Sequence, residues 1–233
     1  MTDDLSQWTP RPLPAHKTLD GRYVRLEPLD PKQHSDELYA ASAIENADEK
    51  FLYLYEEAPT SKDSFNAWVK QVAPSKDPLY YAVIDKASGK VAGRQTFMRM
   101  DPANGSIEIG HIYWGPLISR KPTATEALYL FMRHAFADLG YRRFEWKCNN
   151  KNEPSKSAAQ RFGFQQEGLF RQHLVTKGAN RDTAWFSIID KEWPTLHTAY
   201  EAWLAADNFD AQGQQKQRLS DLIAHAQNAP LVC

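Results

Sequence analysis

The stretch KCNNKNEPSKSAAQRFGF, residues 147–164, decides the fold. It begins at the end of a strand whose alternation places Phe144, Trp146 and Cys148 on one face. A short alanine-rich segment then runs to Gly163, a residue suited to end a helix. Between strand and helix lies a dense polar group, formed by Asn149, Asn150, Asn152 and Ser155. The stretch is therefore a junction from a strand to a helix, with polar side chains at the turn.

A second junction of this kind lies upstream, after the strand SIEIGHIYW at 106–114. The segment that follows reads GPLISRKPTATEA, and Thr123 and Glu126 fit a capping box with Pro122 before it. The period then becomes helical, and Gly140 is placed to end the helix. The expected apolar stripe consists of Leu128, Phe131, Ala135 and Leu139.

The rest of the chain supplies further strands and helices around these junctions. A strand at 22–29 precedes a helix at about 30–43, for which Asp30 is the expected N-cap, and a helix at about 61–73. Strands at 79–85, 90–100 and 106–114 form a meander, and two long strands follow residue 163. The helix between the third meander strand and the strand ending at Cys148 is a crossover, so we expect those two strands to be parallel. The predicted fold class is α/β with a mixed sheet.

Composition limits the partners of this 233-residue chain. Its 28 basic and 29 acidic residues give a net charge of −1, so a nucleic-acid partner is not expected. No run of about 18 apolar residues predicts a membrane span, and the first residues do not resemble a signal peptide. Cys148 and Cys233 form no metal pattern; Cys148 is expected to be a core thiol, a single disulfide stays open, and the cytoplasm is the default compartment.

Both junctions have an ordinary interpretation and a functional one. Thr123, Asn152 and Ser155 are residue types that commonly cap helices, and Arg120 and Lys121 could simply be solvated. Two helices that follow parallel strands, however, direct their N-terminal N–H groups at one edge of the sheet. Such an edge binds anionic ligands.

The sequence resembles the GNAT superfamily of acyl-CoA-dependent N-acetyltransferases, and within it the RimJ/RimL-like branch. The resemblance runs from about Arg22 to Pro194 and rests on GRYVRLEPL, EIGHIYWGP, ATEALYLFMRHAFADLGYRRFEWKC and NEPSKSAAQRFGFQQEGLFR. It implies a mixed, mostly antiparallel sheet that is splayed at an acyl-CoA cleft and flanked by helices. The expected division is an irregular lead-in at 1–20, a GNAT domain at 21–194 and a C-terminal helical extension at 195–233.

The resemblance also implies where acetyl-CoA binds. Pantetheine pairs with the last meander strand, and pyrophosphate lies on the loop after it, where family members carry a glycine-rich pattern. Here Pro122 replaces the first glycine and has no N–H to donate. The residues expected to bind the cofactor are Ile112, Tyr113, Trp114, Arg120, Lys121, Thr123, Ala124, Thr125, Asn150, Asn152 and Ser155.

The expected catalytic residues are Ser155, which the resemblance implies, and Glu108, which projects from the last meander strand and whose ordinary alternative is a solvated strand carboxylate. Many family members place a tyrosine four residues after this serine as the acid for the leaving thiolate, but this chain has Ala159, so Ser155 is the expected proton donor. Glu108 is the expected base, directly or through water. Strand alternation places His111 on the opposite face from Glu108, as a core residue. A strand N–H near Trp114 is expected to polarise the carbonyl.

The acceptor is a primary amine, a small molecule or a protein N-terminus, and Tyr53, Tyr55, Glu56 and the 176–182 loop are expected to shape its pocket. No metal is expected, and the chain is expected to be a monomer or homodimer without a membrane or nucleic-acid partner. A catalytically silent acyl-CoA-binding module is the alternative, motivated by Pro122 and Ala159. A nucleotide-phosphate binder is a third possibility, which no glycine-rich phosphate loop supports.

Overall fold

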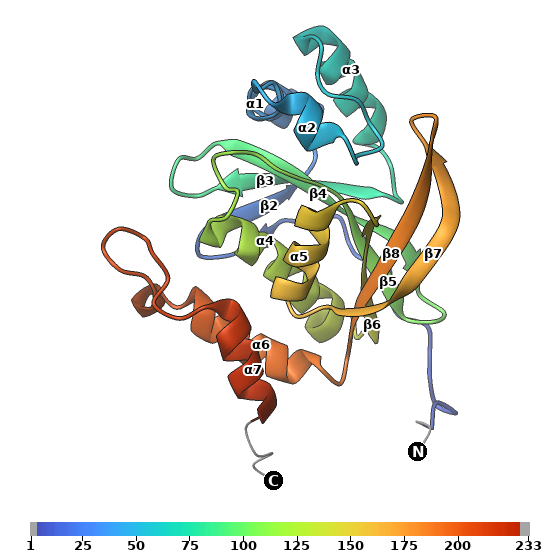
Figure 1. Ribbon diagram of the computed structural model, residues 1–233, viewed down its shortest axis with the longest axis vertical. Helices are drawn as coiled ribbons and strands as arrows, with labels where there is room; N and C mark the ends of the chain where they lie inside the picture. Colours follow the sequence, from blue (N-terminus) through green and yellow to red (C-terminus); the bar gives the residue numbers. More distant parts are fainter. Residues whose placement is uncertain (1–3, 229–233) are drawn as a thin grey trace.

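The computed structural model describes residues 4–228, which fold around one eight-stranded sheet in the order β1-β2-β3-β4-β5-β6-β8-β7 (Figure 1). All neighbouring strands are antiparallel except β5 and β6, which are parallel as the crossover predicted. The strands are β1 (Leu19–Asp20), β2 (Val24–Pro28), β3 (Leu79–Asp85), β4 (Val91–Asp101), β5 (Ser106–Trp114), β6 (Arg143–Asn149), β7 (Gln165–Thr176) and β8 (Ala179–Ile189). This is the mixed, mostly antiparallel α/β fold expected from the sequence.

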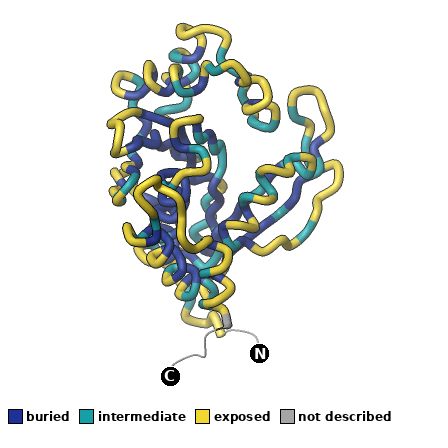
Figure 2. The backbone as a smooth tube through the Cα atoms, turned by 60° about the vertical axis from the view of Figure 1, so that its left-hand side comes forward, coloured by how far each residue is buried: buried dark blue, intermediate teal, exposed yellow. Residues whose placement is uncertain are grey.

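Helices cover both faces of the sheet, and alternate residues of β3 contact the two layers. Tyr80 and Ala82 pack with α1 (Pro31–Ser42) and α3 (Lys62–Val72), and the short α2 (Ala47–Phe51) lies in the same layer. Tyr81 and Val83 pack on the other face, against α4. The helices of that second layer are α4 (Pro122–Arg133), α5 (Glu153–Arg161), α6 (Trp193–Leu204) and α7 (Leu219–Asn228). Figure 2 shows the buried residues concentrated in the sheet and the adjoining helix faces, with the β7–β8 hairpin exposed at its tip.

Two helices begin where the sequence predicted, and a third does not begin with the predicted cap. Asp30 caps α1 by accepting from Lys32 N at 2.7 Å, and Ser61 caps α3, as expected. The predicted capping box of Thr123 and Glu126 is wrong: α4 begins one residue earlier, at Pro122. The Glu126 carboxylate instead accepts from the backbone N–H groups of residues 22–24, at 2.6–2.9 Å. A buried carboxylate gains more from three amide donors of another loop than from one in its own helix.

Helix α4 is buried on all sides, not on one stripe. Every residue from Thr123 to Met132 is buried, because α6 lies on the side away from the sheet. Tyr129 of α4 stacks on Trp193, His197 and Tyr200 of α6. A helix whose outer face carries polar residues can therefore still lie in the core when a later helix packs over that face.

A β-bulge in β5 changes which face its side chains occupy. Gly110 pairs with Thr96 and Tyr113 pairs with Arg94, so two residues of β5 oppose one of β4. His111 lies at this bulge with φ 46°, a left-handed value. The prediction that His111 faces away from Glu108 is therefore wrong: an extra residue reverses the alternation beyond it.

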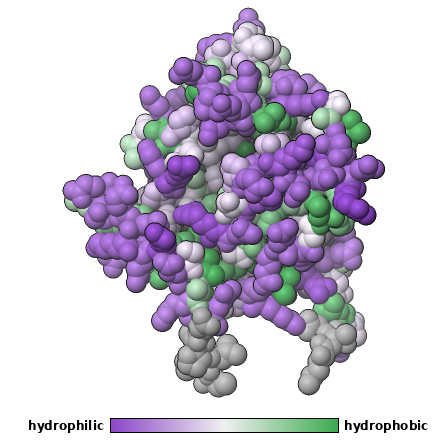
Figure 3. Space-filling view, viewed as in Figure 1, coloured by the Kyte–Doolittle hydropathy of each residue, from purple (hydrophilic) through white to green (hydrophobic). Residues whose placement is uncertain are grey.

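The C-terminal helices join the main core. Leu196 and Tyr200 of α6 and Ile223 of α7 belong to the same buried cluster as α4, and the Tyr200 hydroxyl donates to the Phe162 carbonyl at 3.0 Å. Hydrophilic side chains cover most of the face in Figure 3, with hydrophobic residues in small separate patches. Within residues 4–228, none of the helices has the length and apolar character of a membrane span. Cys148 is a buried free thiol as expected, whereas Cys233 lies outside the described residues.

Candidate active site

The sheet opens between its two parallel strands. β5 and β6 pair from Ser106 with Arg143 as far as Ile109 with Trp146, and the paired register ends there although both strands continue. The open ends of the two strands line a cavity of about 290 Å³. Among its lining residues are predicted site residues from both junctions, namely Glu108, Ile112, Tyr113, Trp114, Asn152 and Ser155. The fold thus brings the two junctions together at one gap.

Ser155 is held at the gap by hydrogen bonds from its neighbours. The Asn152 side chain caps α5 by accepting from Ser155 N at 3.1 Å, so the ordinary capping role of Asn152 is present. The indole Nε1 of Trp146 donates to Ser155 Oγ at 3.0 Å. Because Oγ is the acceptor in this bond, its own hydrogen remains available to another acceptor. Ser155 therefore lies at the gap with its hydroxyl positioned by Trp146.

The thiol beside Ser155 is kept neutral. Burial raises the pKa of Cys148, and its side chain lies next to the Ser155 hydroxyl. Cys148 also lines the cavity, from the open end of β6. A buried neutral thiol is a poor nucleophile, in keeping with chemistry that uses no covalent enzyme intermediate.

The start of α4 continues from the cavity and is rich in donors. Ser119 lines the cavity, and Arg120 and Lys121 follow as exposed cations that form no ion pair with any other described residue. Pro122 stands at the first helical position and has no N–H, so the first N–H groups of this helix belong to Thr123 and Ala124. Two unpaired cations beside free helical N–H groups suit a phosphate.

Some predicted cofactor residues have other roles in the structure. The Thr123 hydroxyl donates to Asp85 at 3.0 Å, and Thr125 is buried near Arg161 Nη1 at 3.4 Å, so neither hydroxyl is free for a phosphate. The Asn150 N–H donates to the Asp182 carbonyl at 2.8 Å, and Asn150 is not among the residues that line the cavity. Ala124 is buried and can offer only its backbone.

Glu108 is a buried carboxylate held by two cations. It is 3% exposed, and both of its oxygens accept from Arg99 Nη1 at 2.9 Å. Lys147 Nζ lies 2.8 Å from Glu108 Oε2 and 2.6 Å from Glu145 Oε2, and 3.8 Å from the centre of the Trp185 ring. Two cations, Arg99 and Lys147, thus lie against the Glu108 carboxylate and neutralise its charge in the buried site.

His111 lies on the same face as Glu108 because of the bulge. Its ring contacts Tyr55 and Tyr80, and its Nδ1 is 3.4 Å from Glu56 and is buried without a hydrogen bond. Burial, followed by the charges of Arg94 and Arg99, lowers the pKa of His111 to about 4, although Glu108 acts in the opposite direction. The imidazole is therefore neutral at pH 7.

Arg94 supports this group from beneath. It is fully buried, donates to the His111 carbonyl at 2.5 Å and pairs with Glu56. Burial lowers the pKa of Arg94 to about 9. Arg94, Arg99, Lys147 and Arg181 were not predicted as site residues, because cations in strands carry no motif and only the fold gathers them around Glu108 and His111.

Three contacts join α2 and the segment after it to the turn after β6 and to the β7–β8 hairpin. The Tyr53 hydroxyl donates to the Lys151 carbonyl at 3.2 Å, which joins the segment after α2 to the turn after β6. Lys177, at the tip of the β7–β8 hairpin, donates to the Phe51 carbonyl at 3.0 Å and pairs with Glu57 at 3.0 Å. Of the residues expected to shape the acceptor pocket, Tyr53, Tyr55 and Arg181 line this cavity, whereas Glu56 does not.

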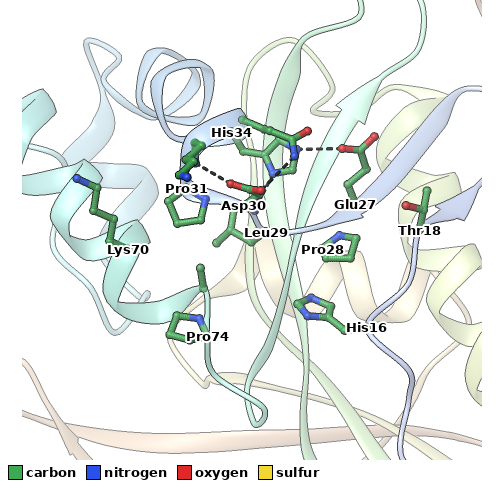
Figure 4. A pocket seen from close by; sticks show the side chains of 13 residues that line it. His16, Thr18, Glu27, Pro28, Leu29, Asp30, Pro31, His34, Lys70 and Pro74 are labelled. Atoms are coloured by element: carbon green, nitrogen blue, oxygen red, sulfur yellow. Dashed lines mark hydrogen bonds and ion pairs between the residues drawn. The ribbon is translucent and has the colours of Figure 1, made fainter.

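A larger hollow of about 880 Å³ lies elsewhere, where β2 meets α1 (Figure 4). Its two histidines have partners within the protein: His34 bonds to Glu27 and to the Asp30 N–H, both at 3.0 Å, and His16 Nε2 is 2.8 Å from the Tyr80 carbonyl oxygen. It is remote from both junctions, so the smaller cavity is the better candidate site. Within residues 4–228, no group of three or more metal-ligating side chains is assembled.

Comparison with known proteins agrees with this geometry. Residues 24–165 match the family model described as an acetyltransferase (GNAT) domain. A crystal structure of a GCN5-related N-acetyltransferase from Brucella melitensis is 60% identical, with a TM-score of 0.93 over 94% of this chain and 100% of that chain.

Two bacterial relatives match with lower identity and over a smaller share of this chain. "Uncharacterized N-acetyltransferase p20" from Bacillus licheniformis is 32% identical over 117 residues, which covers 48% of this chain and 63% of that relative. "Putative ribosomal N-acetyltransferase YdaF" from Bacillus subtilis strain 168 is 27% identical over 178 residues, covering 73% of this chain and 93% of that relative.

Proposed function

The chain belongs to the GNAT acetyltransferase family and is an N-acetyltransferase, and we propose that it transfers acetyl from acetyl-CoA to a primary amine by direct attack in a ternary complex. The observation that carries this proposal is the gap between β5 and β6, which is lined by the end of β5, by Ser119 in the loop before α4 and by the start of α5. The alternative of a silent acyl-CoA-binding module makes the same gap but predicts no turnover.

The residues around the gap fit a long phosphorylated thioester. Arg120, Lys121 and the first N–H groups of α4 would hold the phosphates, at the end of the cavity that Ser119 lines. The open backbone of Ile112 to Trp114 has no strand partner across the gap and would pair with the pantetheine amides. Acetyl-CoA, when bound, supplies the activated acyl group.

Ser155 acts as the proposed proton donor, as expected from the sequence. The Trp146 indole fixes the position of Oγ and leaves its hydrogen for the leaving sulfur. Donation from the indole also polarises the hydroxyl, which makes its proton easier to transfer. Position 159, where many family members carry a tyrosine, is an alanine that is fully buried in the core and offers no hydroxyl.

Glu108 acts as the proposed proton acceptor, through water, and is held in place by Arg99 and Lys147. His111 is neutral but also weakly basic. With a weakly basic His111, the site suits an amine that is already partly neutral, and an α-amine with a pKa near 8 meets this condition better than a lysine side chain near 10.4. We therefore propose an α-amine acceptor, which agrees with a RimJ/RimL-like assignment, and a cytoplasmic enzyme that works as a monomer or homodimer.

The substitution Ser155→Ala tests the proposal. We expect the turnover number, measured as free thiol released from acetyl-CoA with a panel of amines, to fall by about 10- to 100-fold. The dissociation constant of CoA, measured by calorimetry, should change less than about twofold because the hydroxyl does not contact the phosphates. Unchanged turnover would remove Ser155 as donor, and tight CoA binding by the wild type without turnover on any amine would favour the silent module.

A further inference from the structure

Arg181 of β8 is a buried cation without a carboxylate partner. It is 5% exposed, and its Nε donates to Thr183 Oγ1 at 3.2 Å. Its guanidinium carbon lies 5.3 Å from the centre of the Tyr55 ring. Within residues 4–228, no Asp or Glu oxygen lies within ion-pair distance of Arg181, and its two terminal nitrogens donate to none of those residues. Burying a guanidinium with an unneutralised charge is costly unless a ligand or solvent compensates it.

The neighbouring cations differ from Arg181 in this respect. Arg94 pairs with Glu56, and Arg99 pairs with Glu108. Lys147 contacts two carboxylates, those of Glu108 and Glu145. The carboxylates of this face are therefore already engaged, and the charge of Arg181 is left over.

Arg181 is also placed beside the reacting groups. It lines the same cavity as Glu108 and Ser155, and its charge acts on the Cys148 thiol next to Ser155. Along β8 the alternate residues Ala184 and Phe186 face the core, so Arg181 faces the side of the sheet that carries Glu108. Its guanidinium thus lies on the Glu108 side of the sheet, near Tyr55, a residue expected to shape the acceptor pocket.

We propose that Arg181 binds a carboxylate carried by the amine acceptor, so that the enzyme prefers acceptors with a carboxylate close to the reacting amine. This rests on the proposed function, which it narrows to one class of acceptor. A guanidinium with its Nε already engaged still offers two terminal N–H₂ groups, which suit a carboxylate. Polyamines and aminoglycosides carry extra positive charge and are disfavoured by an unneutralised arginine.

The phosphates of the donor do not account for Arg181. They are assigned to the start of α4, which follows β5, whereas Arg181 comes from β8 on the far side of β6. A carboxylate on the acceptor could be the free α-carboxylate of an amino acid or an acidic side chain near a peptide N-terminus. The two sources share one chemistry and can be separated by experiment.

The test uses matched acceptors that differ by one carboxylate, with kcat/KM expressed per neutral amine because an α-carboxylate also raises the pKa of the adjacent amine. One pair is an amino acid and its α-carboxamide, and the other is the peptide amides Asp-Ala-Ala and Asn-Ala-Ala. For wild type we expect kcat/KM to be about 10- to 100-fold higher for the charged member of at least one pair. The pair that shows the preference identifies the source of the carboxylate.

Substitutions then assign the preference to Arg181. Arg181→Gln should remove it by lowering kcat/KM for the charged member alone, and Arg181→Lys should restore part of it. Arg171→Gln, at an exposed arginine of β7, is the matched control and should keep the wild-type preference. The dissociation constant of CoA should be the same in all four proteins.

Two results would overturn the proposal. One is a wild-type enzyme that treats charged and uncharged members alike. The other is an Arg181→Gln variant that weakens both members equally or weakens CoA binding, which would indicate a structural or donor-side role. Calorimetry of the same acceptors with the CoA-bound protein gives the preference without turnover. If no acceptor is acetylated but the charged member still binds more tightly through Arg181, the proposed function fails while this inference stands.

Discussion

His111 shows how much of the site depends on a single residue. Its imidazole reaches the face of Glu108 only because β5 contains one extra residue at the bulge. There it contacts Tyr55 and Tyr80 and lies near Arg94, Arg99, Glu56 and Glu108, the charged groups of this face. Burial in this environment, more than any single neighbour, keeps the ring neutral.

The lowered pKa of His111 predicts acid sensitivity. The folded protein, with the pKa of His111 at about 4, binds fewer protons than the unfolded chain, where the value is 6.5. The contribution of His111 to stability is therefore complete above about pH 6.5 and is lost as the pH falls toward 4. It amounts to at most about 3 kcal/mol over this interval.

Urea unfolding at pH 7 and pH 4.5 measures this contribution. His111→Gln should lose less stability than wild type between the two values, whereas the exposed control His225→Gln should behave as wild type. Equal losses in His111→Gln and wild type would show that the imidazole is not held neutral by the fold.

From the sequence, the place of a single residue in the site could be predicted only where the residue belongs to a local motif. Asn152 and Ser155 follow a strand directly, so their position at the gap could be predicted. The environment of Glu108 could not, because Arg99 and Lys147 come from strands on either side of β5 and meet it only in the sheet. Arg181 was missed for the same reason.

At the scale of elements, the parallel pair β5 and β6 is the decisive feature. The crossover helix predicted their direction, and the pairing confirmed it. Their divergence after Ile109 was expected only from the family resemblance, because no local sequence pattern marks the residue at which the pairing of two strands ends. Likewise, the capping box failed because the partner of Glu126 lies about 100 residues away in the chain.

The pairing of β4 with the open end of β5 should tolerate no added side chain at Gly93. A Cβ there would lie 2.3 Å from the Tyr113 carbonyl oxygen and 3.2 Å from Trp114 Cα. Because both contacts are backbone, Gly93→Ala must separate the strands, and we expect a loss of about 1–3 kcal/mol in the free energy of unfolding. Gly168→Ala, at a position with nothing within 4 Å, is the matched control and should lie within about 0.5 kcal/mol of wild type. A stable Gly93→Ala variant would mean that the strands are less tightly paired than described.

At the scale of the whole molecule, α6 and α7 complete the core that α4 begins. The sequence predicted their helical stripes but not that α6 would cover α4, because tertiary packing decides which side of a helix is exposed. Arg161 of α5 lies over the Trp203 ring of α6, which connects the extension to the helix that carries Ser155. The predicted domain boundary at 194 therefore does not separate two hydrophobic cores, because residues on both sides of it belong to one buried cluster.

Truncation of one α6 side chain should destabilise the entire chain. Leu196 is 1% exposed, so Leu196→Ala should cost about 2–4 kcal/mol in a single unfolding transition. Leu13→Ala, at a leucine that is 60% exposed, is the matched control and should cost little. A separate early transition in Leu196→Ala, with the rest unchanged, would show instead that the extension unfolds independently.

Hydrogen–deuterium exchange with and without CoA is the measurement that tests the account most directly. We expect CoA to slow exchange in residues 110–125 and 149–156, which form the two sides of the gap, and to leave residues 27–34 and 70–74 of the larger hollow unchanged. Protection at the larger hollow, or at only one of the two junctions, would contradict the claim that the donor lies between β5 and β6.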